Sequence, residues 1–276
     1  MEAQKNEAAQ KAKLAQAKSE TQKTGAKKTS AGEKVIDVVN FLIDWTCIIF
    51  FLVLLMFCLY AIYDSVKVYH EAGLPEEVNQ YISEKEGGLR EIDLEGLRKE
   101  NPDIIGWLTL DGTTIDYPIL QTNNNQYYLS HNYKKEYAYS GSIYVDWQNA
   151  NDFSDEYTLI YGHNTNNEVM FGPLKSYNND DFFNKNTTGK LYTLHGVYEL
   201  TVGAEFVTDK DNNNVYDVGE YKNKGSVVRD YIKQNASHYR EINPEHKIIA
   251  LTTCQGQANM RQVVYVSFDA NNPIKK

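Results

Sequence analysis

A lone cysteine followed by an arginine is the part of this sequence best suited to covalent chemistry. Cys254 ends a β-rich stretch that begins at Ile248, and Arg261 opens a second β-rich stretch seven residues later. A neighbouring cation lowers the pKa of a thiol and so increases the fraction of nucleophilic thiolate. If the two stretches pair as adjacent strands, a guanidinium lies beside the thiol. Cys254 is therefore a candidate nucleophile.

The cysteine count supports this reading. The sequence has three cysteines, and Cys47 and Cys58 lie inside an apolar N-terminal segment. Cys254 therefore has no disulfide partner in the rest of the chain, and a lone thiol in a domain outside the cell is a candidate nucleophile. The alternative is a buried structural cysteine, which is the common role of a single cysteine in a globular domain.

Acyl transfer by a thiol also needs a proton shuttle and a group that stabilises the oxyanion. Of six histidines, His163 is set apart because it follows a β-rich stretch and Gly162, which lets the backbone bend. His163 is thus expected at the exit of a strand, as Cys254 is. A satisfied core or surface role is the alternative for His163, and a structural salt bridge is the alternative for Arg261. No Asp or Asn is clearly placed as a third member behind His163.

The stretch Leu251-Thr252-Thr253-Cys254, followed by Arg261, resembles the active-site signature of sortases, the cysteine transpeptidases of Gram-positive cell surfaces. Further motifs in the same order make the sequence similar to class B sortases over roughly residues 75–270; these motifs lie at 101–108, 115–121, 141–146 and 161–164. The resemblance implies that Cys254 is the nucleophile, His163 the general acid and base, and Arg261 the oxyanion stabiliser. This chemistry requires no cofactor.

Substrate contacts are predicted at both sides of these residues. The stretch 125–129 resembles a class B segment that lines the groove for the sorting signal, and three further residues flank the candidate catalytic strands. The predicted contacts are Asn125, Leu129, Tyr161, Thr252 and Thr253. Ordinary packing or loop polarity is the alternative for all five. Class B relatives often carry an acid after the cysteine, whereas this chain has Gln255.

Short β-rich segments separated by turns follow residue 101, which is typical of a mainly β fold. They are Gly106–Leu110, Thr113–Ile119, Ser142–Val145, Tyr157–Tyr161, Lys190–Thr193 and Tyr198–Val207. Asp111-Gly112 is a hairpin turn signal. The spacing of apolar residues in Val227–Asn235 predicts a crossover helix before the cysteine strand. The resemblance implies a closed sortase-type β-barrel of about eight strands with N-terminal helices.

The N-terminal part predicts a membrane anchor. Residues 1–34 contain eight Lys and four Glu with few large apolar residues, so we expect a disordered basic tail. Trp45–Tyr63 has nineteen residues without a charge, which at ~1.5 Å per residue matches a bilayer core of ~30 Å. A cleaved signal peptide, the alternative, usually has a shorter apolar core and a small-residue cleavage site. The predicted organisation is a tail at 1–34, a transmembrane region at 35–63, a helical stalk at 64–100 and a catalytic barrel at 101–276.

Charge predicts the orientation of this anchor and excludes one class of partner. Lysines precede the apolar segment, so the positive-inside rule predicts a cytoplasmic N-terminus and an extracellular catalytic domain. Residues 64–276 carry 20 basic and 31 acidic side chains, a net charge of −11. We therefore expect no nucleic-acid partner.

One acidic stretch meets a calcium-binding pattern. Asp209, Asp211, Asn213, Asp217 and Glu220 occupy positions 1, 3, 5, 9 and 12 of an EF-hand loop. Asn214 stands at position 6, where Gly is usual, and no helix clearly precedes the stretch. A polar surface loop is the alternative.

The resemblance implies a membrane-anchored transpeptidase that cleaves a C-terminal sorting signal of Asn-Pro-x-Thr type after Thr. Cys254 would hold the acyl group as a thioester, and an amino group of a peptidoglycan precursor would then displace it. The expected partners are surface proteins bearing such a signal and the wall amine. Three alternatives stay open: a pilin-polymerising sortase, a cysteine hydrolase that uses water, and a non-catalytic binding domain tethered to the membrane.

Overall fold

The structure is a computed structural model that describes residues 11, 13, 31–73, 76–84, 90–164, 168–254 and 259–275. By internal contacts the chain divides into two units, Met1–Tyr63 and Asp64–Lys276. The helix α2 (Ala31–Ala72) contains a candidate membrane span, Ala31–Lys67, within which an 18-residue window has a mean hydropathy of 2.6. By length and composition, this helix is able to cross a membrane. The predicted transmembrane segment lies within it.

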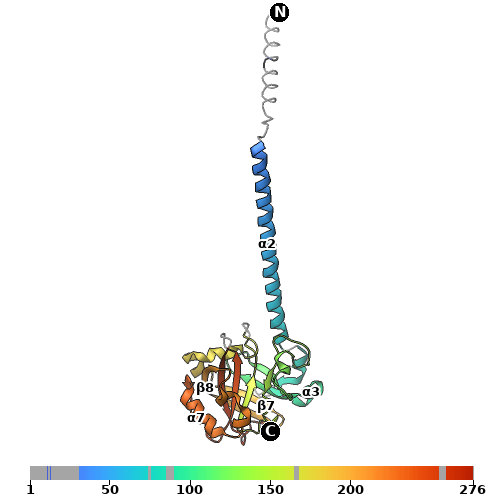
Figure 1. The fold of residues 1–276 in the computed structure, drawn as a ribbon. Coiled ribbons are helices and arrows are strands. Elements are labelled where there is room, and N and C mark those ends of the chain that lie inside the picture. Colours follow the sequence, from blue (N-terminus) through green and yellow to red (C-terminus); the bar gives the residue numbers. More distant parts are fainter. Residues whose placement is uncertain are drawn as a thin grey trace, which may run out of the picture. The chain divides into compact units, whose positions relative to one another are not determined.

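Eight strands of the second unit form a closed barrel, as predicted (Figure 1). They are β3 (Ile104–Leu110), β4 (Asp116–Leu120), β5 (Ile143–Val145), β6 (Tyr157–Tyr161), β7 (Thr188–Thr193), β8 (Gly196–Asp209), β10 (Lys247–Cys254) and β11 (Met260–Phe268). Their order is β11-β10-β6-β5-β4-β3-β7-β8, and pairing of β8 with β11 closes the ring. The pairs β4–β5 and β6–β10 are parallel. The short strand β9 (His238–Tyr239) adds to β8.

Short helices connect and cover these strands. They are η1 (Glu76–Tyr81), α3 (Leu94–Glu100), η2 (Tyr127–Leu129), η3 (Gly172–Asn178), α4 (Asp180–Lys185), α5 (Asn213–Tyr216), α6 (Val218–Tyr221) and α7 (Gly225–Asn235). The helix α7 is the predicted crossover helix. The region predicted to be helical at 64–100 also contains a small antiparallel hairpin, β1 (Ile82–Glu84) with β2 (Arg90–Ile92), which the sequence analysis did not anticipate.

Strand alternation divides the apolar residues of β10 between two cores. Ile249 and Leu251 pack inside the barrel, whereas Ile248 and Ala250 pack outside it with residues of α7. Successive side chains of a strand point to opposite faces, so a run of four apolar residues requires cover on both sides. The helix α7 lies beside β8 on the outer side and supplies that cover (Figure 1). A third core joins α3 and η1 to β3.

A buried carboxylate connects three strands on the side of β8. Glu205 is only 1% exposed, and its Oε1 accepts a 2.6 Å hydrogen bond from Gln262 Nε2. Its Oε2 lies 2.8 Å from His238 Nδ1, and His238 Nε2 lies 2.6 Å from Asp180 Oδ1. The hydrogen bonds to Glu205 and then to Asp180 raise the pKa of His238 above its ordinary value.

Candidate active site

The three predicted catalytic positions lie at or just beyond the ends of three neighbouring strands. In the parallel pair β6–β10, Tyr161 is opposite Thr252, and Gly162 N continues this ladder by donating to Thr252 O at 3.1 Å. His163 and Cys254 each follow this pair by two residues. In the antiparallel pair β10–β11, Cys254 is opposite Arg261. Cys254 and Arg261 are thus directly paired, and His163 lies two residues past the last paired residue of β6, Tyr161. These three chain positions form a row at the ends of β6, β10 and β11.

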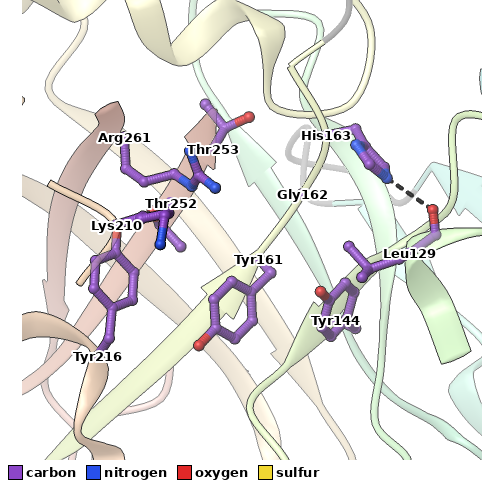
Figure 2. A pocket seen from close by; sticks show the side chains of 10 residues that line it. All are labelled: Leu129, Tyr144, Tyr161, Gly162, His163, Lys210, Tyr216, Thr252, Thr253 and Arg261. Carbon is purple, nitrogen blue, oxygen red and sulfur yellow. Dashed lines mark hydrogen bonds between the residues drawn. The ribbon is translucent and has the colours of Figure 1, made fainter. Parts of the chain in front are cut away.

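A cleft of about 330 Å³ lies at this end of the strands. Its lining residues are Leu129, Tyr144, Tyr161, Gly162, His163, Lys210, Tyr216, Thr252, Thr253 and Arg261. Figure 2 shows His163 and Leu129 on one side of the cleft and Arg261, Lys210 and Tyr216 on the other. Six predicted site residues are among them; the side chain of Cys254 lies outside the described part of the chain.

The sequence analysis did not predict three of the lining side chains, namely Tyr144, Lys210 and Tyr216. Tyr144 belongs to the motif at 141–146, so a signal for it was present in the sequence. Lys210 and Tyr216 come from the segment between β8 and α7, which folds back toward the end of β10: the Tyr216 hydroxyl is 2.9 Å from Thr252 Oγ1. No residue pattern within this segment indicates that the chain returns to the end of β10.

The imidazole of His163 is held by the main chain of the helix η2. Its Nε2 lies 2.7 Å from the carbonyl oxygen of Leu129. A carbonyl oxygen only accepts hydrogen bonds, so Nε2 carries a proton in this arrangement. The other ring nitrogen, Nδ1, is then the atom able to exchange a proton with a reacting group. Leu129 therefore orients the histidine through its backbone, while its exposed side chain lines the cleft.

Gly162 precedes His163 for a steric reason. A Cβ at this position would lie 2.6 Å from Ile143 Cδ1 and 2.7 Å from ring atoms of Phe171. Contacts below 3.0 Å force neighbouring atoms to move. Gly162 is not among the described glycines with positive φ, so a left-handed backbone does not explain this glycine. The residue is needed because strand β6 passes close to buried side chains immediately before the histidine.

The two threonines before Cys254 differ in their hydrogen bonding. Thr252 Oγ1 contacts the hydroxyl of Tyr216. Thr253 is 4% exposed, and its Oγ1 has no hydrogen-bond partner in the structure as described. A buried hydroxyl without a partner is uncommon and usually has a functional explanation. Thr253 lines the cleft, and its hydroxyl is buried there without a partner among the described residues.

Tyr161 is anchored by a buried carboxylate beneath the cleft. Its hydroxyl donates to Asp146 Oδ2 at 3.0 Å, and its ring stacks on Tyr144 with centroids 5.3 Å apart. Burial, followed by the nearby Asp146, raises the pKa of Tyr161. Asp146, which the sequence analysis did not single out, is 1% exposed. It fixes the aromatic floor of the cleft.

Asn125 does not line the cleft. Its Nδ2 donates to Asp146 Oδ2 at 2.6 Å, and its Oδ1 accepts from Trp147 N at 2.9 Å. Both polar ends of the amide therefore hold the segment before η2 in place. The predicted contact between Asn125 and substrate stays a prediction.

The motif at 101–108 makes hydrogen bonds that hold the helix η2 and the segment that follows it. The Nδ2 of the buried Asn101 donates to the hydroxyl of Tyr128 at 2.9 Å and to Tyr133 O at 2.6 Å. The hydroxyl of Tyr128 in turn donates to Asp103 Oδ2 at 2.8 Å. These bonds fix the residue next to Leu129, whose carbonyl orients His163.

The candidate calcium loop is folded in a different way. The strand β8 precedes it, and α5 and α6 occupy its middle and end. Asp209 Oδ1 accepts from Asp211 N at 2.9 Å, Asp217 caps α6 by accepting from Glu220 N at 3.1 Å, and Glu220 pairs with Lys224. Within the described ranges, no group of three His, Cys, Asp or Glu residues is arranged to hold a metal ion. These carboxylates serve as caps and surface ion pairs.

The closed barrel, with histidine, cysteine and arginine positions in one row, is the architecture of a known class of enzymes. The sortase domain model matches residues 108–268, which is more than half of the chain. The chain belongs to the sortase family of cysteine transpeptidases, and within that family to class B.

The three similar proteins described next are all class B sortases. Sortase B of Listeria monocytogenes is 36% identical over 196 residues, which cover 69% of this chain and 75% of that protein. The structure of a Staphylococcus aureus sortase B–substrate complex has a TM-score of 0.59 and 28% identity, and covers 64% of this chain and 84% of that one. A class B sortase of Streptococcus pyogenes involved in pilus biogenesis has a TM-score of 0.57 and 33% identity, and covers 63% and 96%. Membership supports a sortase transpeptidase function.

Proposed function

We propose that this protein is a membrane-anchored transpeptidase that cleaves an Asn-Pro-x-Thr-type sorting signal after Thr and joins the surface protein to an amino group of cell-wall peptidoglycan. One observation supports the proposal: Cys254 is directly paired with Arg261, and His163 and Arg261 both line the cleft at the end of β6, β10 and β11. Directly paired positions of a sheet lie close together on one face. The three residue types supply the three functions that acyl transfer to a thiol requires.

In the first half of the reaction, the thiolate of Cys254 adds to the carbonyl carbon of the substrate Thr. The carbonyl oxygen becomes an oxyanion, and the guanidinium of Arg261 stabilises it. His163 then donates a proton to the leaving amine as the carbon–nitrogen bond breaks, which leaves a thioester. Loss of one oxyanion donor costs about 10²–10³ in kcat in other acyl-transfer enzymes.

In the second half, an acceptor amine adds to the thioester carbon and His163 removes the proton that the amine loses. The thiolate leaves, and a new amide bond forms. The same histidine therefore acts as acid and then as base. The leaving amine and the incoming amine occupy the same side of the cleft, which is the side of His163 in Figure 2.

The cleft also offers contacts for the sorting signal. We assign the apolar part of the contact to Leu129 and the ring of Tyr161, both of which line the cleft. The buried hydroxyl of Thr253, which has no partner among the described residues, is assigned a hydrogen bond to the substrate that forms when the side chain turns toward the cleft. Thr252, which is bonded to Tyr216, shapes the wall between them.

The proposed location is the outer face of a cell membrane. The helix α2 supports a membrane anchor by its length and composition. The eight lysines of residues 1–34 favour a cytoplasmic N-terminus, and the acidic composition of residues 64–276 fits the opposite side of the membrane. Protease added to intact cells is expected to digest the barrel unit and to leave the N-terminus protected.

The test uses the full-length chain in detergent with a fluorogenic sorting peptide and an amine acceptor. Wild-type protein is expected to form a peptide–amine product, and Cys254→Ala to form none while retaining its melting temperature. His163→Ala is expected to lose about 10²–10⁴ in kcat, and Arg261→Lys about 10²-fold or more. Cleavage that persists in Cys254→Ala would reject the proposal, and release of the free acid alone would favour the hydrolase alternative.

Pilin polymerisation is a second candidate, supported by the similarity to the Streptococcus pyogenes enzyme involved in pilus biogenesis. The two functions differ in the acceptor amine, which is a wall-peptide amine in one case and a pilin lysine in the other. Competition between a wall-peptide amine and a lysine-containing pilin peptide, with the two products separated by mass, distinguishes them.

A further inference from the structure

The cleft carries positive charge in a domain that is otherwise acidic. Residues 64–276 have a net charge of −11, yet the described residues that line the cleft include Lys210 and Arg261 and no Asp or Glu. A concave site lined by one sign of charge concentrates ligands of the opposite sign. The catalytic roles proposed above use Arg261 but assign nothing to Lys210.

Lys210 is fixed beside Arg261 by the backbone. Arg261 is paired with Thr208 in the ladder between β8 and β11, and Lys210 N donates to Asn259 O at 2.7 Å just beyond its end. Figure 2 shows the side chains of Lys210 and Arg261 on the same side of the cleft, opposite His163. Lys210 and Arg261, the residue proposed to hold the oxyanion, therefore line the same side of the cleft.

The ammonium group of Lys210 is bound only loosely. Its Nζ donates to both carboxylate oxygens of the adjacent Asp211 at 2.8 Å, but the two side chains are 41% and 75% exposed. Exposed ion pairs contribute little because water screens them and two flexible side chains must be ordered. A carboxylate that enters the cleft can therefore replace Asp211 at small cost.

We infer that Lys210 is a specificity residue that binds a carboxylate of the substrate, with Asp211 as an internal competitor for the same ammonium group. The inference rests on the proposed transpeptidase function. Since the amines occupy the side of His163, a carboxylate at Lys210 belongs to the acyl donor, such as an acidic residue within the sorting signal. A carboxylate beside the acceptor amine has the same chemistry, and the experiment separates the two sources.

The donor arm compares two peptides that differ only in Glu or Gln at the variable position of an Asn-Pro-x-Thr signal, with the full-length chain in detergent. The measured quantity is the ratio of kcat/KM for the Glu peptide to that for the Gln peptide. We expect a ratio of about two to five in the wild type, the range for an exposed ion pair. The ratio is expected to fall to about one in Lys210→Gln, to persist in Lys210→Arg, and to rise in Asp211→Asn.

A matched control removes one positive charge elsewhere. Lys233 lies on α7 outside the cleft lining and makes a comparable exposed pair with Glu241. Lys233→Gln is expected to keep the wild-type ratio. Raising the salt concentration to about 0.5 M should lower the ratio, because screening weakens exposed charge pairs. A ratio that does not depend on Lys210 would overturn the inference.

The acceptor arm compares Nα-acetyl-lysine, which has a carboxylate, with its carboxamide. A preference for the acid that is lost in Lys210→Gln and is seen only in this arm would overturn the assignment to the donor. Turnover of the neutral Gln peptide that requires Cys254 would show that the transpeptidase function stands even if no charge preference is found. Absence of turnover for both peptides would reject the function and the inference together.

Discussion

Replacing Gly162 by alanine tests whether the placement of His163 controls catalysis. The added Cβ would lie 2.6 Å from Ile143 Cδ1 and 2.7 Å from the ring of Phe171, and both neighbours are fully buried. Overpacking of this kind costs about 1–3 kcal/mol. A loss of about 2 kcal/mol lowers the melting temperature of a domain of this size by about 4–8 °C.

The same strain is passed to the next residue of the chain. The imidazole of His163 has a hydrogen bond of 2.7 Å to Leu129 O, so a shift of the backbone alters that contact. A displacement of about 1 Å in a catalytic group is able to cost about 10²-fold in rate. We therefore expect Gly162→Ala to lower kcat/KM by about 10- to 100-fold at a temperature where the protein is fully folded.

The control is a glycine with an equivalent clash outside the site. A Cβ at Gly203, on β8, would lie 2.6 Å from Ile242 Cγ1. Gly203→Ala is expected to lose similar stability and to keep its activity. Thermal melts and peptide-cleavage kinetics on the full-length chain in detergent measure both quantities. Equal activities in the two variants, with equal losses of stability, would refute the link between Gly162 and the histidine.

Four further outcomes are expected. Thr253→Val removes the unpartnered buried hydroxyl, so stability is retained while kcat/KM falls up to about tenfold, the value of one hydrogen bond; unchanged kinetics would exclude a substrate contact there. Asn125→Ala removes both hydrogen bonds of that amide and is expected to lower stability by about 1–3 kcal/mol in denaturant melts, whereas a pure substrate contact would change KM alone. The pKa of His238 is raised above its ordinary value of 6.5, mainly by the hydrogen bond to Glu205. Protonated His238 therefore stabilises the fold fully below pH 6.5, and this stabilisation is lost as pH rises through the raised pKa. The melting temperature should fall over that pH range in the wild type and fall less in His238→Gln. Millimolar calcium is expected to leave the melting temperature unchanged, because the carboxylates of 209–220 serve as caps and ion pairs, and a rise of several degrees would contradict this reading.

Most strands of the barrel were predictable from the sequence because the pattern of apolar residues along a strand reflects which of its faces are buried. The continuous apolar runs of β10 and β11, which are rich in Val, Ile and Leu, follow from burial on both faces. The hairpin at Asp111-Gly112 was predicted from the turn residues, and Gly112 has the positive φ of +74° that such turns favour. Such strands and turns are determined mainly by residues that are close together in the sequence.

The parts that were missed depend on contacts between distant segments. Lys210 and Tyr216 reach the cleft because the chain after β8 returns to β10, and nothing in their own sequence indicates this return. The strands β1 and β2 have three residues each and carry no clear alternation. The EF-hand pattern is ambiguous because Asp and Asn are also the preferred N-cap residues, and Asp217 serves as one.

The row formed by His163, Cys254 and Arg261 has a consequence for the durability of the enzyme. Its members follow or belong to three strands that are hydrogen-bonded to one another within a closed ring, and β11 is bonded on both of its edges. Segments of this type exchange their amide hydrogens mainly through global opening. Heating or ageing is then expected to convert active molecules directly into inactive ones, so the number of active molecules declines while each surviving molecule keeps its full turnover.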